Sequence, residues 1–157
     1  MCIRDSISKI TSTENVTLVT FDSVPANISF LEKIFCAFAD RGINVDMISK
    51  ATPTREYASL SFTTGDNQLT EVLAMTNEIR SRYPTLKPIV SSSNVKLSLY
   101  GEDFPKYTGI AAQVFQVLAS KGIELLLITT SDVDISLLVS SADHYKAEAA
   151  LKELVLS

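Results

Sequence analysis

The feature that most constrains this chain is an internal duplication. The stretch Ser29–Lys50 is matched 80 residues later by Gly109–Thr130, with the same order of features. Each copy predicts an amphipathic helix and then a short apolar strand, because apolar residues first recur at helical spacing and then run together. Gly42 and Gly122 each follow a basic residue and stand where a helix needs a left-handed C-terminal cap. A period near 80 residues is too long for a solenoid repeat, so the duplication indicates two domains.

Each half of the chain predicts an α+β unit of the ferredoxin-like βαββαβ type. The strands are recognised by alternation of apolar and polar residues or by short apolar runs, and the helices by their apolar stripes. In the first half the expected strands are Val16–Phe21, Ile43–Ser49, Tyr57–Thr63 and Lys87–Ser91, with one helix ending at Arg41 and another capped by Asp66 or Asn67. In the second half the expected elements are strands Val95–Tyr100, Ile123–Thr129 and Ile135–Ser141 and helices Ile110–Lys121 and His144–Leu154.

The domain boundaries follow from this count of elements. We expect a first domain over residues 13–92 and a second over residues 93–157. The second half ends before a fourth strand, which would leave a row of unpaired backbone groups in its sheet. The alternating stretch Ile7–Thr11 has no role in the first domain, and a polar turn is expected after it at Ser12–Asn15. We therefore expect residues 7–11 to complete the second sheet, so that the first domain is inserted in the second.

Composition excludes several classes of function. A net charge of −4 and a pI near 5.0 argue against a nucleic-acid partner. No apolar run reaches the roughly 18 residues needed to span a membrane, and no signal-peptide pattern opens the chain, so we expect a cytoplasmic protein. The two cysteines make neither a disulfide framework nor a metal site, and Cys36 is expected in the core of its helix. No metal and no cofactor are expected.

The same βαββαβ pattern also serves RNA-binding modules, metal chaperones and small hydrolases. An RNA-binding module needs exposed aromatic residues on its central strands and a basic face, and a metal chaperone needs a Cys-x-x-Cys loop. An enzyme needs an acid–base pair or an activated nucleophile. The single histidine, His144, opens a mostly polar helix and is expected to be solvated. We therefore assign no catalytic residue in this chain.

The duplicated motifs resemble a known family. Gly42–Ser49 reads GINVDMIS, and the second copy contains GIAAQVF at Gly109–Phe115 and ITTSDVDIS at Ile128–Ser136. These motifs are similar to the tandem ACT domains of aspartate kinase, and the similarity runs from about Ile7 to Leu154. The resemblance implies two ACT domains with their sheets paired side by side, and a regulatory module that binds an amino acid, usually lysine or threonine. It also implies dimers, or a separate regulatory subunit that works with a kinase catalytic subunit.

An α-amino acid carries a carboxylate and an ammonium group, so its site needs an anion cradle and an acceptor. In the first domain the helix-entry loop offers backbone N–H groups at a positive helix end, with plain helix capping as the alternative. The resemblance implies that the start of the next strand faces the ammonium group, and it makes Asp46 the preferred acceptor. The candidate effector-binding residues are Asn27, Ile28, Ser29, Phe30, Asn44, Val45, Asp46 and Ser49.

The second domain offers an equivalent loop, in which a glycine permits close approach of the backbone to a ligand. Its acceptor is less clear, because Leu126 stands where the first domain has Asp46. The candidates there, for effector binding or for an interface, are Thr108, Gly109, Ile110, Thr130, Ser131 and Asp132. We expect the first domain to bind the effector and the second to build the interface. Two hypotheses remain open at this point, namely an effector-binding regulatory module of aspartate kinase and an interaction module that dimerises without a ligand.

Overall fold

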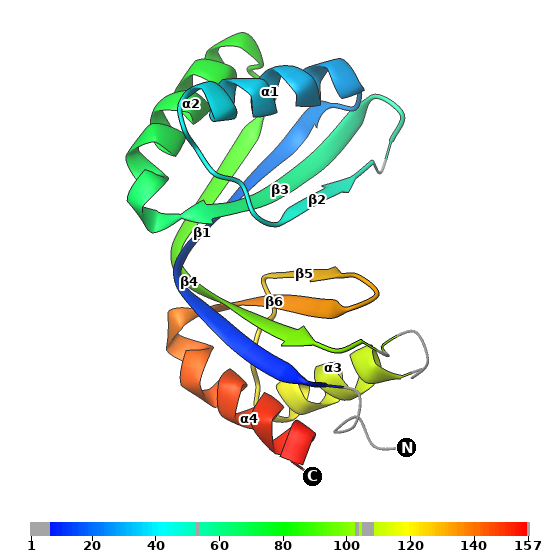
Figure 1. Cartoon of the computed structure of the whole chain (residues 1–157). Helices are drawn as coiled ribbons and strands as arrows, with labels where there is room; N and C mark the ends of the chain where they lie inside the picture. The colour runs from blue at the N-terminus through cyan, green and yellow to red at the C-terminus, as the bar shows by residue number, and fades with distance from the viewer. Residues whose placement is uncertain (1–6, 53, 103, 105–108, 157) are drawn as a thin grey trace. The chain divides into compact units, whose positions relative to one another are not determined.

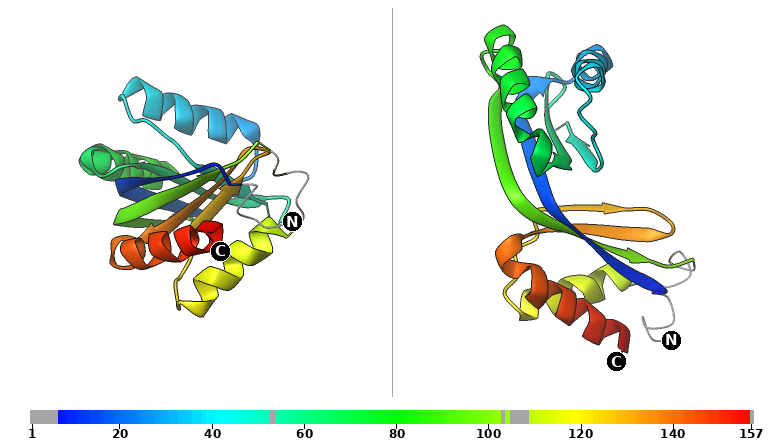
Figure 2. Two further views of the ribbon diagram at one scale, coloured as in Figure 1. Left: turned by 60° about the horizontal axis from the view of Figure 1, so that its bottom comes forward. Right: turned by 60° about the vertical axis from the view of Figure 1, so that its left-hand side comes forward.

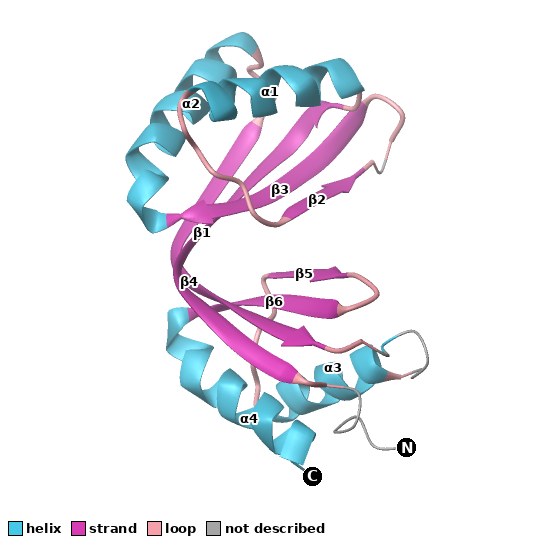
Figure 3. Cartoon of the chain, viewed as in Figure 1, coloured by secondary structure: helices cyan, strands magenta, loops and turns pink. Residues whose placement is uncertain are grey.

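The chain forms two compact units, one made of residues 15–93 and one made of residues 94–157 with the stretch that ends at Glu14 (Figure 1). The structure is a computed structural model, which describes residues 7–52, 54–102, 104 and 109–156. Each unit has a sheet with a helix pair on one face, as Figures 2 and 3 show.

The unit of residues 15–93 has the sheet order β2-β3-β1-β4. Strand β3 pairs antiparallel with β1 on one side and with β2 on the other. Helices α1 and α2 cover one face of this sheet (Figure 3). The elements are β1 (Lys9–Pro25), α1 (Ile28–Asp40), β2 (Ile48–Ala51), β3 (Tyr57–Gly65), a 3₁₀ turn (Asp66–Gln68), α2 (Leu69–Arg82) and β4 (Lys87–Tyr100).

The other unit repeats this plan with the sheet order β1-β4-β6-β5. Strand β6 pairs antiparallel with β4 and with β5. Helices α3 and α4 lie on one face of the sheet (Figure 3). The further elements are α3 (Ile110–Ser120), β5 (Leu127–Thr130), β6 (Asp134–Ser140), a 3₁₀ turn (Ser141–Asp143) and α4 (His144–Leu156). The predicted fold class, two ferredoxin-like βαββαβ domains with antiparallel sheets, is confirmed.

Two long strands each contribute to both units, which the sequence did not reveal. Strand β1 runs without a break from Lys9, so the polar turn expected at Ser12–Asn15 is wrong. A strand can hold these polar residues because Ser12, Thr13 and Glu14 are exposed to solvent. At the point where β1 passes from one unit to the other, Asn15 departs from regular strand geometry with a φ of 58°.

The strands that follow α1 and α3 are shorter than predicted. Strand β2 begins at Ile48 and not at Ile43, and β5 begins at Leu127 and not at Ile123. In both copies the leading isoleucine is buried as a core residue, 4% and 7% exposed, in the connecting segment that precedes the strand. Its hydrophobicity reflects burial under the helix, and an apolar run alone does not distinguish that from a strand.

The core of the unit of residues 15–93 is built around aromatic side chains. Phe62 on β3 is fully buried and meets the ring of Phe38 at 4.9 Å and that of Phe21 at 5.6 Å between centroids. These edge-on and tilted arrangements suit the quadrupoles of the rings. The buried hydrophobic residues are Val19, Phe21, Val24, Phe30, Ile34, Phe38, Ile43, Ala58, Leu60, Phe62, Val72, Met75, Ile79 and Leu86.

The other core is almost wholly aliphatic. It is closed at the start of β1 by Ile7, which is 6% exposed and lies among residues from β4, β6, α3 and α4. The remaining buried members are Val95, Leu97, Leu99, Phe104, Ile110, Val114, Leu118, Ile123, Ile135, Leu137, Val139, Ala147 and Leu151. Each unit therefore buries its own hydrophobic cluster.

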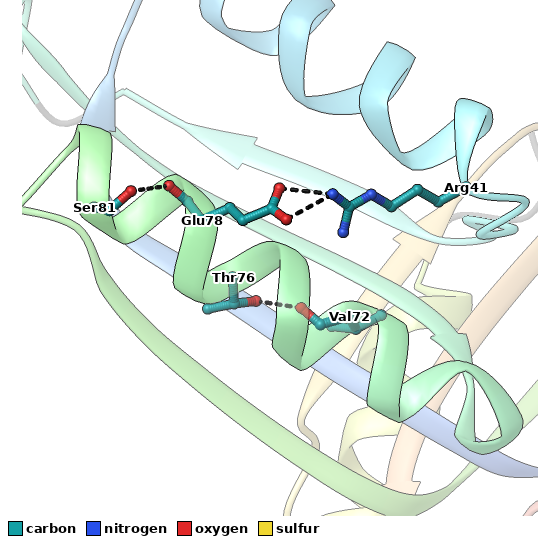
Figure 4. Close-up of polar contacts among 5 residues, drawn as sticks. All are labelled: Arg41, Val72, Thr76, Glu78 and Ser81. Atoms are coloured by element: carbon teal, nitrogen blue, oxygen red, sulfur yellow. Dashed lines mark hydrogen bonds and ion pairs between the residues drawn. The ribbon is translucent and has the colours of Figure 1, made fainter.

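An ion pair ties the end of α1 to α2 (Figure 4). The Arg41 guanidinium Nη2 donates to both carboxylate oxygens of Glu78, at 2.8 and 2.7 Å. The hydrogen bond from Arg41 lowers the pKa of Glu78 below its ordinary value, and the bond to Glu78 raises the pKa of Arg41. Within α2, Thr76 Oγ1 donates to the Val72 carbonyl at 2.8 Å and Ser81 Oγ to the Glu78 carbonyl at 2.6 Å.

Two side chains lie elsewhere than the sequence predicted. Cys36 is exposed, because it faces away from the stripe of α1 that packs on the sheet. His144 is only 5% exposed, and the expectation of a solvated histidine is wrong. Its ring stacks on Tyr145 at 4.5 Å, and its Nδ1 and Nε2 lie 3.4 and 3.2 Å from carboxylate oxygens of Glu14 and Glu148.

In the part of the chain that the structure describes, no helix is both long enough and apolar enough to cross a membrane.

Candidate functional site

A pocket lies where α3 begins, in the unit that contains residues 94–157. Gly109 precedes the helix in a left-handed conformation, with φ of 85°, and makes no side-chain cap. The first N–H groups of a helix have no partner within it, so the start of α3 presents donors at the positive end of the helix. This combination favours an anionic group such as a carboxylate.

The pocket has a volume of about 240 Å³. Its apolar floor is buried, since Phe104, Ile110 and Ile135 are at most 9% exposed. Its rim is polar, and comes from the end of β5. The lining residues are Phe104, Gly109, Ile110, Ala111, Thr130, Ser131 and Ile135. Apolar residues with a few convergent polar groups are the kind of lining that can hold a small molecule.

Ser131 also builds the turn between β5 and β6. Its Oγ donates to the Asp134 carboxylate and accepts from the N–H groups of Val133 and Asp134 at 3.2 Å. The other carboxylate oxygen of Asp134 accepts from Ser136 Oγ at 3.0 Å. The turn therefore holds the rim of the pocket in place, while the Ser131 hydroxyl itself is largely engaged.

Four of the six candidates in this unit, Gly109, Ile110, Thr130 and Ser131, thus line one pocket. Asp132 is exposed and is not among the described lining residues. Thr108 lies outside the described residues. No acidic side chain occurs in the described lining, so an ammonium group would be met there by hydroxyl or carbonyl oxygens.

In the other unit, the helix-entry loop is used to cap α1. Asn27 Oδ1 accepts the Phe30 N–H at 2.9 Å, which is the usual geometry of an N-cap. The Phe30 side chain is a core residue, 3% exposed, with its ring 4.8 Å from that of Tyr83. Ile28 and Ser29 are exposed. Of the backbone donors proposed for an anion, the Phe30 N–H is therefore already taken.

The candidates that follow α1 lie beyond the opposite end of that helix. Asn44 donates its N–H to Gln68 Oε1 at 3.0 Å, and Gln68 also binds the carbonyl of Gly42 and the hydroxyl of Thr64. The Gln68 side chain thus fixes the segment that follows α1. Sequence reasoning missed this residue, because a polar side chain at the start of a helix does not indicate such a role. Asp46 is exposed and donates its N–H to the Thr63 carbonyl at 3.0 Å, Val45 is half-buried, and Ser49 lies on β2 opposite Ser61.

Asn27 and Asp46 are therefore not brought together within one unit. Helix α1 lies between them, and its 13 residues span about 20 Å. The pairing along β3 also places them apart. Pro25 lies opposite Tyr57, whereas the Asp46 N–H binds the carbonyl of Thr63, six positions along the strand. One amino acid cannot contact both residues in the same unit. In each unit, the first helix begins at the end of the unit where the strand after it finishes. Helix α1 begins at the end where β2 finishes, and α3 at the end where β5 finishes (Figure 1).

No group of three or more histidine, cysteine, aspartate or glutamate side chains suited to a metal ion was found among the described residues. Four of the candidate residues, at the start of α3 and the end of β5, line one pocket, and that pocket suits a small ligand with an anionic group.

Comparison with known proteins agrees with the fold. The family model of the ACT domain matches residues 97–154. An aspartokinase of Geobacillus stearothermophilus is 32% identical over 141 residues, which are 90% of this chain and 33% of that protein. An aspartokinase of Bacillus sp. (strain MGA3) is 30% identical over 141 residues, 89% of this chain and 34% of that protein. This chain is similar to the ACT-domain region of aspartate kinases.

Solved structures show the same similarity. The ligand-free regulatory subunit of aspartate kinase from Thermus thermophilus has a TM-score of 0.84 at 23% identity, covering 95% of this chain and 98% of that one. Aspartokinase III of E. coli in complex with lysine and aspartate has a TM-score of 0.67 at 25% identity, covering 94% of this chain and 32% of that one. The resemblance to aspartate kinase regulatory domains is confirmed. This chain spans about a third of the length of the curated relatives it matches.

Proposed function

We propose that this chain is an allosteric regulatory module of a cytoplasmic aspartate kinase, and that an amino acid, lysine or threonine, binds in the pocket at the start of α3. The observation that carries the proposal is the convergence of Gly109, Ile110, Thr130 and Ser131 around one pocket. The ligand carboxylate lies at the N–H groups of the first turn of α3, and its ammonium group meets oxygens at the end of β5. This differs from our expectation that the first domain binds the effector.

The proposed domains are residues 13–92 and residues 93–157, the second completed by residues 7–11, with bounds that differ by one or two residues from those of the compact units 15–93 and 94–157. The kinase reaction belongs to a catalytic part, in the same polypeptide or in a partner subunit. Feedback then follows if the amino acid binds one arrangement of the protein better than another. Coupling free energies between two such sites are typically ~1–3 kcal/mol, which corresponds to changes in affinity of about 5- to 150-fold.

The first-domain candidates gain a role if two copies pair through β2. Strand β2 is the last strand of its sheet in the described residues, and it runs from the Asp46 side toward the end of the unit where α1 begins. Antiparallel pairing of two β2 strands reverses this direction in the second copy. The segment containing Asn44, Val45 and Asp46 of one copy would then approach Asn27 of the other. We propose this dimer arrangement for a second effector position.

The proposal is tested by placing a negative charge in the pocket. Ala111 is exposed, lies in the first turn of α3 and lines the pocket, whereas its neighbour Ala112 is exposed and is not part of the lining. Glutamate is favourable in the first turn of a helix, so both Ala111→Glu and Ala112→Glu are expected to fold. Isothermal titration calorimetry with lysine, threonine and methionine is then compared for the wild type and both variants, and for Asp46→Ala.

Binding of one amino acid that is lost in Ala111→Glu and kept in Ala112→Glu supports the pocket. Loss in Asp46→Ala alone would move the effector to the β2 interface. If the wild type gives no binding heat with any of the three amino acids and sediments as a dimer, the proposal would be replaced by the alternative of a dimerisation module without ligand.

A further inference from the structure

The outer edge of β1 is open in the unit of residues 94–157. The residues of β1 that pair with β3 begin at Val16, so among the described residues Lys9–Glu14 has a strand neighbour only in β4. Ser8 donates its N–H to the Tyr100 carbonyl at 2.7 Å and so faces β4. Because successive residues of a strand turn their backbone groups to opposite sides, Lys9 directs its N–H and carbonyl outward. An edge of this kind is a template for pairing with another chain.

A groove of about 300 Å³ lies between this edge and the last turns of α4. It is lined by Lys9 and Ile10 from the strand, by Ile7 and Ser8 just before it, and by Lys152 and Val155 from the helix. The apolar members continue the core, since Ile7 is buried and Ile10 and Val155 pack against the same hydrophobic cluster. The groove therefore combines outward-facing main-chain groups with a place for an apolar side chain.

Both charged side chains in the described lining of the groove are cationic, in a chain whose net charge is −4. Lys152 Nζ lies 3.3 Å from Glu148 Oε1, and Lys9 Nζ lies 5.9 Å from the centre of the Tyr100 ring. An ammonium group has three donors, so each lysine can donate to a further carboxylate and keep its present contact. The groove is therefore complementary to an acidic partner.

We propose that an extended acidic segment of a partner protein docks here as an additional strand on β1. Its main chain pairs with the outward groups of Lys9, one apolar side chain fills the groove against Ile10 and Val155, and carboxylates along the segment reach Lys9 and Lys152. In such strand addition the main chain supplies affinity and the pocket for a side chain supplies specificity. The proposal goes beyond the effector function and does not depend on the pocket at α3.

The test uses a short fluorescein-labelled peptide that alternates glutamate with valine, and a matched peptide that alternates lysine with valine. Fluorescence anisotropy is measured with the wild-type chain and with the double variant Lys9→Glu, Lys152→Glu. The control is Lys146→Glu, which makes the same kind of charge change on α4 outside the groove, at a lysine that pairs with Asp143. Hydrogen exchange of the Lys9 amide, with and without peptide, reports strand addition itself.

We expect saturable binding of the glutamate peptide, at least roughly tenfold weaker binding in the double variant, little change in Lys146→Glu, and slower exchange of the Lys9 amide on binding. Equal binding of the lysine peptide, unchanged binding by the double variant, or an unchanged Lys9 exchange rate would each overturn the proposal. Self-association of the chain through this edge, seen by sedimentation and abolished by the same double variant, would overturn it in favour of a second copy as occupant.

Discussion

Replacing Gly109 by alanine should weaken effector binding more than its effect on stability can explain. Gly109 has a φ of 85°, and a Cβ built on it meets no atom of the described residues within 4 Å. The cost of the substitution is therefore backbone strain and not a steric clash, and for a residue with a Cβ this is roughly 1–2 kcal/mol. Partial relief by a local shift moves the first N–H groups of α3 away from the ligand carboxylate.

Gly122 provides a matched control at the other end of the same helix. Its φ is 67°, and a Cβ on it also meets no atom within 4 Å. Gly109→Ala and Gly122→Ala should therefore lower the free energy of unfolding by similar amounts, about 1 kcal/mol each. With a dependence on urea of roughly 1–2 kcal/mol per molar, the unfolding midpoint falls by about 0.5–1 M in both variants.

The two variants should differ in calorimetry with the amino acid that binds the wild type. Gly109→Ala is expected to bind roughly tenfold more weakly, which corresponds to about 1.4 kcal/mol, whereas Gly122→Ala binds as the wild type does. Gly109→Asn should lose less, because asparagine tolerates the left-handed conformation better than alanine. Equal affinities for Gly109→Ala and Gly122→Ala would refute the argument that the start of α3 holds the carboxylate.

Three further predictions concern stability, each measured by urea unfolding followed by circular dichroism. Asn27→Ala removes the cap of α1 and should cost about 1 kcal/mol, while Asn27→Ser keeps most of it; equal losses would contradict a capping role. The pKa of Glu78 lies below its ordinary value of 4.5, so its contribution to stability is present at neutral pH and is lost as the pH falls through the lowered pKa. Glu78→Gln should therefore reduce the loss of unfolding free energy at acidic pH, and the difference from the wild type should be smaller in high salt. An unchanged dependence on pH would contradict a stabilising role of the ion pair. His144→Ala should cost about 1–3 kcal/mol because the side chain is buried, and a cost no larger than that of exposed Tyr145→Ala would contradict this.

The fold could be predicted because the duplication repeats its local signals. Gly42 and Gly122 end equivalent helices, and the alternating stretches became β3 and β6 close to their expected bounds. The strands expected separately at Lys87–Ser91 and Val95–Tyr100 are instead one continuous strand, β4. Apolar runs were less informative, since Ile43 and Ile123 are buried in connections and not in strands. Nothing in the sequence indicated that His144 is buried, and one of its two carboxylate neighbours, Glu14, is remote in sequence.

The candidate site was predictable only in part, because it depends on the direction in which the strand after the helix runs. The sequence places Asp46 close after α1, but a helix of 13 residues carries it to the far end of the unit from Asn27. What returns to the helix entry is the end of the next strand, which in the second copy is Thr130 and Ser131. The correct pairing depends on the direction in which the second strand runs, and the spacing of residues along the chain does not show this.

The central claim is that an amino acid binds through the first turn of α3. The most direct measurement is an NMR titration of the ¹⁵N-labelled chain with lysine and with threonine. The account predicts saturable shifts of the amide signals of Ile110, Ala111 and Ser131 with one of the two amino acids. Saturable shifts confined to other parts of the chain, or none with either amino acid, would contradict it.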